Sequence, residues 1–213
     1  EDENLKAFDR PAMARIVEYG SRLAGDQNKL STRFNDVGEI VYEAEQLARN
    51  DDSEYVEAKH VDKAIREKKF RSNRIEEKIQ EMIKKGKILI DISGGVVGQV
   101  NGLSVIGIGD YMFGQPSRIT AVTYMGRGGI INVERETDMS GNIHSKGVLT
   151  MSGYLGGKFA QEVPLGLTAQ ITFEQNYGGV DGDSASCAEL YAILSSLAEI
   201  PIKQNLAVTG SVN

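Results

Sequence analysis

The chain has 213 residues, 40% of them hydrophobic, and a formal net charge of −6. This length is enough to bury a substantial core, and the acidic balance argues against a nucleic-acid surface, which needs clustered basic residues. The single cysteine, Cys187, excludes an intrachain disulfide and fits a reducing, cytoplasmic compartment.

No membrane segment or signal peptide is predicted. No stretch approaches the run of about 20 apolar residues that a membrane helix needs, and no signal peptide opens the chain. The chain begins at Glu1 without a methionine, which we interpret as a piece of a longer protein.

Charge and glycine content divide the chain near Gly86. Residues 1 to 86 hold most of the charged residues but only four of the 24 glycines, and residues 87 to 213 hold the others. The first part is typical of charged helices, and the second of strands joined by tight turns.

Apolar residues at helical spacing predict four short helices in the first part. The first begins near Pro11, whose missing N–H costs nothing at a helix start, and ends near Gly25. The others are expected from about residue 31, over residues 61–65 and over residues 75–83. Such helices with brief connections predict a small four-helix bundle, and we expect His60 to face solvent.

Short apolar runs bounded by glycines predict strands in the second part. A longer hairpin is expected around the turn at residues 125–128, and a helix over residues 143–159. Strands followed by helices that pack on one face predict an α+β domain. The expected strands are residues 88–92, 96–100, 103–106, 117–124, 129–134, 168–174 and 206–209.

The stretch GGVDGDSASCAEL, residues 178–190, carries the strongest chemical signal. Its glycines suit close approach of a substrate backbone, and it continues directly into a helical pattern over residues 185–198. Ser184 thus lies at a helix start, where free N–H groups and the helix dipole favour negative charge, so it is a candidate nucleophile. The alternative is that Asp183 or Ser184 is an ordinary N-cap. We interpret Cys187 as a small buried residue.

Several motifs together resemble the proteolytic domain of Lon proteases of the B type. They are GVDGDSAS at residues 179–186, AELYA at 188–192, LAVTGSVN at 206–213, GQVNGLSV at 98–105 and HSKGVL at 144–149. The resemblance implies an ATP-dependent serine endopeptidase with a Ser-Lys dyad. It also implies a hexameric ring that degrades unfolded or damaged cytosolic polypeptides.

The same resemblance implies roles for individual residues. Ser184 matches the nucleophile, Asp181 the acidic residue near the dyad, and Thr209 a residue beside the site. The family's general-base lysine follows the serine by about forty residues, which places it beyond Asn213. We therefore expect this chain by itself to be inactive.

The expected chemistry is acyl transfer. A buried lysine loses its proton readily and can deprotonate Ser184, while backbone N–H groups at Asp183 and Ala185 stabilise the oxyanion. An alternative is an unrelated hydrolase in which His144 or Lys146 is an internal base. A further alternative is a ring-forming Lon-like scaffold without peptidase activity.

Two stretches of the first part resemble the small helical lid of AAA+ ATPases, VEAKHVDKAI at residues 56–65 and LSTRF at residues 30–34. The resemblance implies that Arg33 is the sensor-2 arginine that reaches nucleotide phosphates, which a guanidinium grips in pairs. The alternative is a solvated arginine on a helix surface. No Walker loop occurs, so we expect ATP with Mg²⁺ to be bound mainly by an upstream domain.

These patterns together predict three segments. Residues 1–70 are expected to form an all-α lid subdomain, residues 71–86 a stiff helical linker, and residues 87–213 an α+β Lon-type proteolytic domain. Asn73, as a cap with Glu76 three positions later, supports the linker helix. No metal site is expected within the chain, and no nucleic-acid partner.

Overall fold

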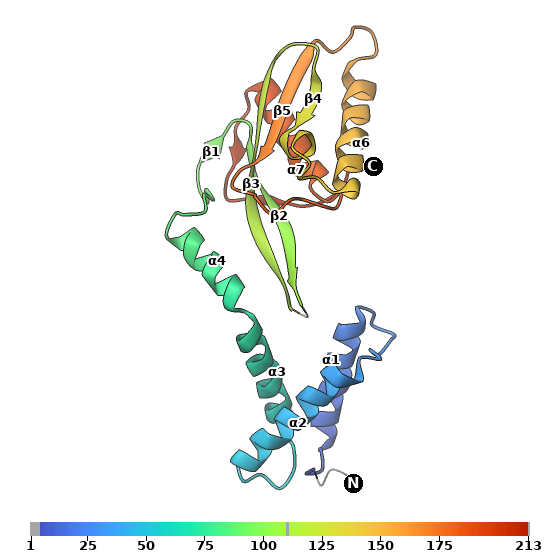
Figure 1. The fold of residues 1–213 in the computed structure, drawn as a ribbon, viewed down its shortest axis with the longest axis vertical. Helices are drawn as coiled ribbons and strands as arrows, with labels where there is room; N and C mark the ends of the chain where they lie inside the picture. Colours follow the sequence, from blue (N-terminus) through green and yellow to red (C-terminus); the bar gives the residue numbers. More distant parts are fainter. Residues whose placement is uncertain (1–4, 110, 213) are drawn as a thin grey trace. The chain divides into compact units, whose positions relative to one another are not determined.

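The computed structural model describes residues 5–109 and 111–212. The chain forms two compact units, Glu1–Ile75 and Glu76–Asn213, which are drawn in Figure 1. A helical unit followed by a unit built on a mixed sheet confirms the predicted fold class.

Three helices form the first unit: α1 (Arg10–Ala24), α2 (Phe34–Asn50) and α3 (Ala58–Ser72). The carboxylate of Asp9 caps α1 by accepting a hydrogen bond from the N–H of Ala12 at 2.7 Å, and Gly25 ends the helix in the left-handed conformation. Mostly small residues let the helices approach closely, and they form the core: Ala12, Ile40, Ala44, Ala48, Val56, Val61 and Ala64.

Two expectations for the helical part were wrong. The fourth helix, α4 (Arg74–Lys84), has no buried residue and belongs almost entirely to the second unit, so the bundle has three helices. His60 is only 1% exposed, because its Nδ1 accepts a hydrogen bond from the N–H of Glu57 and its Nε2 lies 3.2 Å from the Asp51 carboxylate. This histidine closes the start of α3 instead of facing solvent.

A five-stranded sheet in the order β4-β5-β3-β2-β7 forms the centre of the second unit. β2 and β3 pair antiparallel, β5 pairs antiparallel with β3, and β4 and β7 add parallel edges. A second, two-stranded sheet joins β1 (Gly95–Val96) to β6 (Ile202–Lys203). The strands of the large sheet are β2 (Gln99–Ile108), β3 (Tyr111–Met125), β4 (Gly129–Asn132), β5 (Leu167–Phe173) and β7 (Ala207–Val208).

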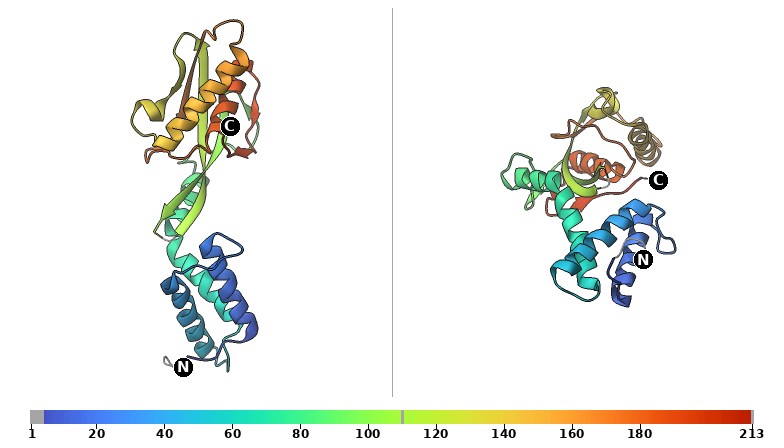
Figure 2. Two further views of the ribbon diagram at one scale, coloured as in Figure 1. Left: turned by 90° about the vertical axis from the view of Figure 1, so that its right-hand side faces the viewer. Right: turned by 60° about the horizontal axis from the view of Figure 1, so that its bottom comes forward.

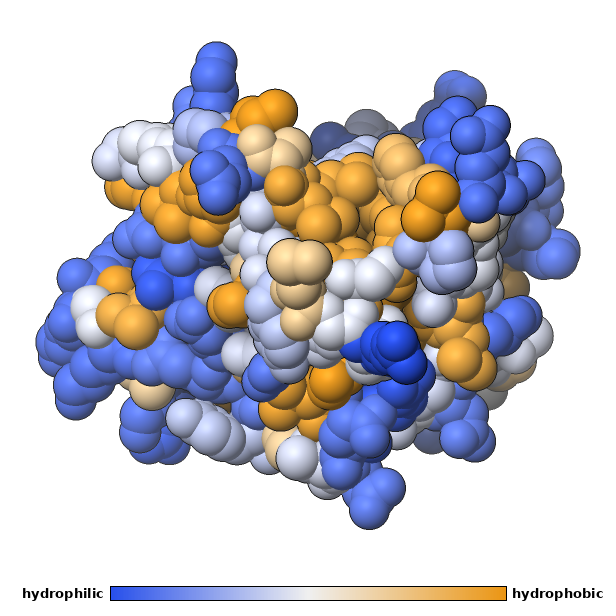
Figure 3. All heavy atoms as spheres, turned by 90° about the horizontal axis from the view of Figure 1, so that it is seen from above, coloured by the Kyte–Doolittle hydropathy of each residue, from blue (hydrophilic) through white to orange (hydrophobic). Residues whose placement is uncertain are grey.

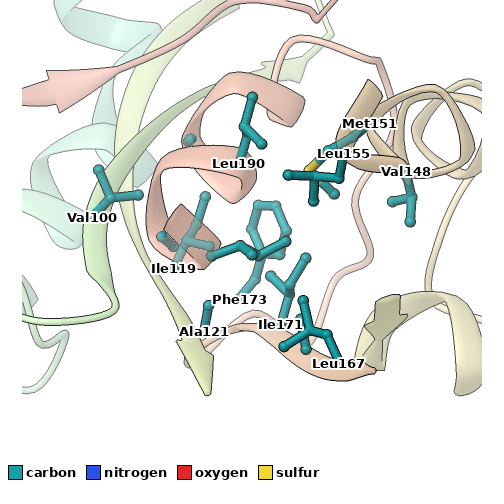
Figure 4. Close-up of a cluster of buried hydrophobic side chains, with 14 residues drawn as sticks. Val100, Ile119, Ala121, Val148, Met151, Leu155, Leu167, Ile171, Phe173 and Leu190 are labelled. Atoms are coloured by element: carbon teal, nitrogen blue, oxygen red, sulfur yellow. The ribbon is translucent and has the colours of Figure 1, made fainter. Parts of the chain in front are cut away.

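Two long helices cover one face of this sheet, α6 (Asn142–Phe159) and α7 (Ser186–Ala198) (Figures 1 and 2). A short helix, α5 (Val133–Glu136), follows β4. Side chains of β2, β3, β5, α6 and α7 meet in one core, drawn in Figure 4. This packing fixes the start of α7 against the sheet and so positions the residues just before the helix. Among the described residues no helix is long and apolar enough to span a bilayer.

Three strand expectations were wrong. Residues 88–92 form no strand, and residues 99–108 form one continuous strand where two were expected. The expected hairpin between residues 117–124 and 129–134 does not form, because β5 lies between β3 and β4. The hairpin that does form joins β2 to β3, and the partner of β4 comes from nearly forty residues further along the chain.

Candidate active site

Ser184 is exposed and lines a cleft of about 480 Å³ in the second unit. Ser184, Asp181 and Thr209 all line this cleft. One wall is the outer half of β2, residues 103–106, and the opposite wall is the connection between β5 and α7. The predicted nucleophile is therefore accessible from solvent and lies beside an extended strand.

The backbone of Ser184 is held by the segment that follows β7. Its carbonyl accepts hydrogen bonds from the N–H of Gly210 at 2.6 Å and from the Thr209 hydroxyl at 3.4 Å. The Gly210 carbonyl in turn accepts from the N–H of Cys187 at 3.0 Å. Thr209 thus contacts the backbone of Ser184 and not its side chain.

Asp181 serves as a helix cap supplied from elsewhere in the chain. Its Oδ1 accepts hydrogen bonds from the N–H groups of Ile143 and His144, at 3.2 and 3.3 Å, at the start of α6. The N-cap position of α6 is Gly141, which has no side chain to do this. The backbone N–H of Gly182 and then that of His144 lower the pKa of the Asp181 carboxyl below its usual value. Asp181 therefore carries a negative charge at neutral pH and joins the loop before Ser184 to α6.

His144 lies in a buried polar network and does not reach the cleft. It is 1% exposed, and its Nε2 lies 3.1 Å from Oε1 of Glu189, which is fully buried in α7. Its Nδ1 lies 2.8 Å from the Ser140 hydroxyl, and Asn132 also donates to Glu189. With both ring nitrogens engaged, His144 is not the base of an internal triad, so that alternative is wrong.

No residue that lines the cleft, among those the structure describes, is a lysine or a histidine. Lys146, the other candidate for an internal base, is exposed on α6 and does not line the cleft. Among the described residues, the backbone N–H groups of Asp183, Ser184 and Ala185 donate to no acceptor. These donors remain available to a negatively charged oxygen at the start of α7.

Neither the serine nor the aspartate at the turn is an ordinary cap of α7. The helix begins at Ser186 with Ala185 in the N-cap position, and no side chain caps it. Ser186 instead donates its hydroxyl to the carbonyl of Asp183 at 2.8 Å. The alternative that Ser184 is the N-cap residue of α7 is thus wrong.

Sequence reasoning missed the polar residues beneath the site. Asn132 and Glu189 are both fully buried, and together they hold the ends of β4 and α7 to His144. The one available signal was Glu189 itself, a charged residue inside the otherwise apolar stretch from Ala188 to Ile193. A carboxylate in an apolar helix face requires a buried partner.

Arg33 lies in the first unit, immediately before α2, with its side chain 64% exposed and 3.9 Å from the carboxylate of Asp36. An exposed guanidinium can contact phosphate. Among the residues that the structure describes, no group of three or more His, Cys, Asp or Glu side chains could hold a metal ion.

A helical unit followed by an α+β unit built on a mixed sheet is consistent with a helical ATPase lid joined to a protease domain. Residues 7–71 match the family described as archaeal LonB, AAA+ ATPase LID domain. The chain belongs to the Lon protease family, in its B type.

Several relatives carry names of Lon proteases or of their putative homologs. A putative Lon protease homolog of Escherichia coli is 34% identical over 99% of this chain and 36% of its own length. A second putative Lon protease homolog, from Haemophilus influenzae, is 40% identical over 60% of this chain and 22% of its own length. The archaeal Lon protease of Archaeoglobus fulgidus is 30% identical over 100% of this chain and 33% of its own. The chain thus spans about a third, or less, of the length of these relatives.

Proposed function

We propose that this chain is the lid and proteolytic portion of an ATP-dependent serine endopeptidase of the Lon type. Ser184 is its nucleophile. The observation that carries the proposal is the exposure of Ser184 in a cleft that also contains Asp181 and Thr209. The substrates are unfolded or damaged polypeptides of the cytoplasm.

The shape of the cleft suits an extended peptide. β7 pairs with β2 only at Asn101 and Gly102, so residues 103–106 of β2 line the cleft with no described strand on that edge. A peptide laid along this edge can add a strand by main-chain hydrogen bonds. Such binding depends little on side-chain identity, which suits an enzyme that degrades many unfolded proteins.

The Ser184 hydroxyl oxygen attacks the peptide carbonyl, the C–N bond breaks, and the amine leaves with the proton taken from the hydroxyl; water then hydrolyses the acyl-enzyme. A lysine from a part of the longer protein outside these residues removes the hydroxyl proton, since no described residue lining the cleft is a lysine or a histidine. Backbone N–H groups of Asp183 to Ala185 stabilise the oxyanion, each contributing about 3 kcal/mol in comparable sites. Asp181 and Thr209 position the loop and the backbone of the nucleophile.

ATP with Mg²⁺, when bound, drives substrate delivery, and a nucleotide-binding domain outside this chain holds most of it. Arg33 is the group of this chain that contacts the phosphates. Its exposure at the start of α2 supports this role.

In the longer protein, Arg33→Ala is expected to lower ATP turnover more than tenfold without loss of assembly. Arg22→Ala on α1 is the matched control. Unchanged turnover in Arg33→Ala would contradict the assignment.

The second unit assembles into a hexameric ring with copies of itself. Figure 3 looks onto one end of this unit and shows apolar side chains gathered there. Large apolar residues at the β3–β4 turn and after α6 are exposed, among them Met125, Phe159 and Val163. Exposed apolar patches of this kind mark protein contacts. A monomer by sedimentation of the longer protein would contradict the ring.

Degradation of an unfolded protein by the longer protein tests the function. The wild type is expected to degrade casein in an ATP-dependent manner, Ser184→Ala to lose this activity, and Ser152→Ala, at an exposed site on α6, to keep it. Assembly of a ring that degrades nothing would favour the scaffold alternative. Loss of activity in both variants would contradict a specific role for Ser184.

A further inference from the structure

The second residue of the connection between β5 and α7 has an unfavourable backbone conformation. Gln175 has a φ of 56°, in the left-handed region that glycine and asparagine tolerate best. It occupies the third position of a turn that is closed by a hydrogen bond from the N–H of Asn176 to the carbonyl of Phe173. Glycine adopts this φ at a lower conformational free energy than glutamine. The presence of glutamine therefore indicates that its side chain has a use beyond the turn.

That use is a pair of hydrogen bonds to the backbone that follows α4. Oε1 of Gln175 accepts from the N–H of Leu89 at 2.7 Å, and its Nε2 donates to the carbonyl of Lys87 at 2.9 Å. One amide thus pairs with residues 87–89 as a neighbouring strand would. The backbone at Lys87 and Leu89 is thus paired with a side chain, where the sequence predicts a strand over residues 88–92.

A second connection joins the same two segments. The largely buried Arg118 places Nη2 3.0 Å from the carboxylate of Asp91 and Nη1 3.5 Å from that of Glu174. The N–H of Glu174 also donates to the Arg118 carbonyl at 2.9 Å. Residues 87–91 are therefore held directly by Gln175, and by Arg118, which bridges Asp91 and Glu174.

The wall of the cleft begins at Asn176, the residue after Gln175. Asn176 and residues 178–181 line the cleft, and this run ends at the carboxylate that caps α6. On the other side, residues 87–89 follow α4, which is separated from α3 by Asn73 alone. A displacement of residues 87–91 therefore reaches the cleft wall through Gln175 and the sheet through Asp91.

We propose that Gln175 is a positioning residue, whose amide holds the cleft wall, residues 176–181, to the chain that follows α4. A shift of residues 87–89 then alters the cleft. The consequence for proteolysis rests on the proposed function, but the positioning itself does not. Gln175 does not itself line the cleft, so its effect passes through the wall.

The decisive variant is Gln175→Gly in the longer protein, because glycine relieves the backbone conformation and removes only the amide. Hydrogen exchange is expected to rise at least tenfold at the Leu89 amide and at amides of residues 178–181, with an unchanged thermal midpoint. KM for a peptide substrate is expected to rise several-fold, with little change in kcat. Gln175→Glu keeps the acceptor and loses the donor, so an intermediate effect is expected. Gln170→Ala, exposed on β5, is the matched control.

Unchanged exchange over residues 178–181 in Gln175→Gly would overturn the proposal, whatever the activity. If the wild type hydrolyses no peptide, the proposed function fails, and the exchange data alone still decide the role of Gln175. If the wild type is active and exchange rises without any change in KM, the wall does not control the cleft and the proposal is also overturned.

Discussion

Gly141 and Asp181 lie so close together that no side chain fits at residue 141. A Cβ built on Gly141 would lie 2.3 Å from Cγ of Asp181, far inside van der Waals contact. The same aspartate accepts the hydrogen bonds of the first N–H groups of α6. The absent side chain at Gly141 is thus what lets the loop before Ser184 close onto α6.

Gly141→Ala is expected to destabilise the protein. The φ of Gly141 is −69°, which alanine adopts freely, so the cost is purely steric and should be about 1–3 kcal/mol in urea unfolding. Gly153→Ala is the control on the same helix, where a Cβ meets nothing within 4 Å. It should stabilise the protein by about 0.5–1 kcal/mol. Equal changes in the free energy of unfolding for the two variants would show that the Asp181 side chain does not occupy the space beside residue 141.

The Asp181 cap should weaken at acid pH. Because the folded state lowers the pKa of this carboxyl, its contribution to stability is present above the usual value of about 3.9. It is lost as the pH falls through the lower pKa of the folded state. Hydrogen exchange at the Ile143 and His144 amides should rise over that range in the wild type. In Asp181→Asn, hydrogen exchange at these two amides should be raised already at neutral pH and should vary less with pH. Identical pH dependences of exchange in the wild type and the variant would contradict the role of Asp181 as a cap.

The buried pair of His144 and Glu189 should be costly to break. Glu189→Ala leaves the imidazole and the Asn132 amide without their buried partner, at an expected cost of about 3–5 kcal/mol in chemical unfolding. Glu162→Ala, at an exposed position after α6, should change stability by less than about 0.5 kcal/mol. A double-mutant cycle with His144→Ala should show strong coupling; additive effects would mean that the two side chains act independently.

Tyr111 should titrate unusually late. A hydrogen bond from its hydroxyl to the carboxylate of Glu76 raises the pKa of Tyr111 to about 12. The stability from this bond is fully present below about pH 10 and is lost as the pH rises through about 12. The difference in tyrosinate absorbance between wild type and Tyr111→Phe should show this late titration. Glu76→Gln should shift it toward about 10, and no shift would contradict the bond.

The helices could be predicted from the sequence because their signals are local. Caps such as Gly25 and apolar spacing mark α1, and the same spacing marks α6 and α7. The Ser184 cleft could be predicted in outline, since Asp181 and Ser184 are neighbours in sequence and Thr209 follows one helix later.

The errors arose where the partner of a segment is distant in sequence. β5 separates β3 from β4, and the amide of Gln175 takes the place of a strand beside Leu89. His60 was expected at the surface because nothing in its own helix shows that it pairs with the Glu57 backbone and with Asp51. Spacing along one element cannot reveal such contacts.

Covalent labelling of the longer protein tests the central claim most directly. A fluorophosphonate probe, followed by digestion and mass spectrometry, should place the adduct on Ser184, and Ser184→Ala should abolish it. An adduct on another serine, or none at all on a protein that still degrades casein, would contradict the assignment of Ser184 as the nucleophile.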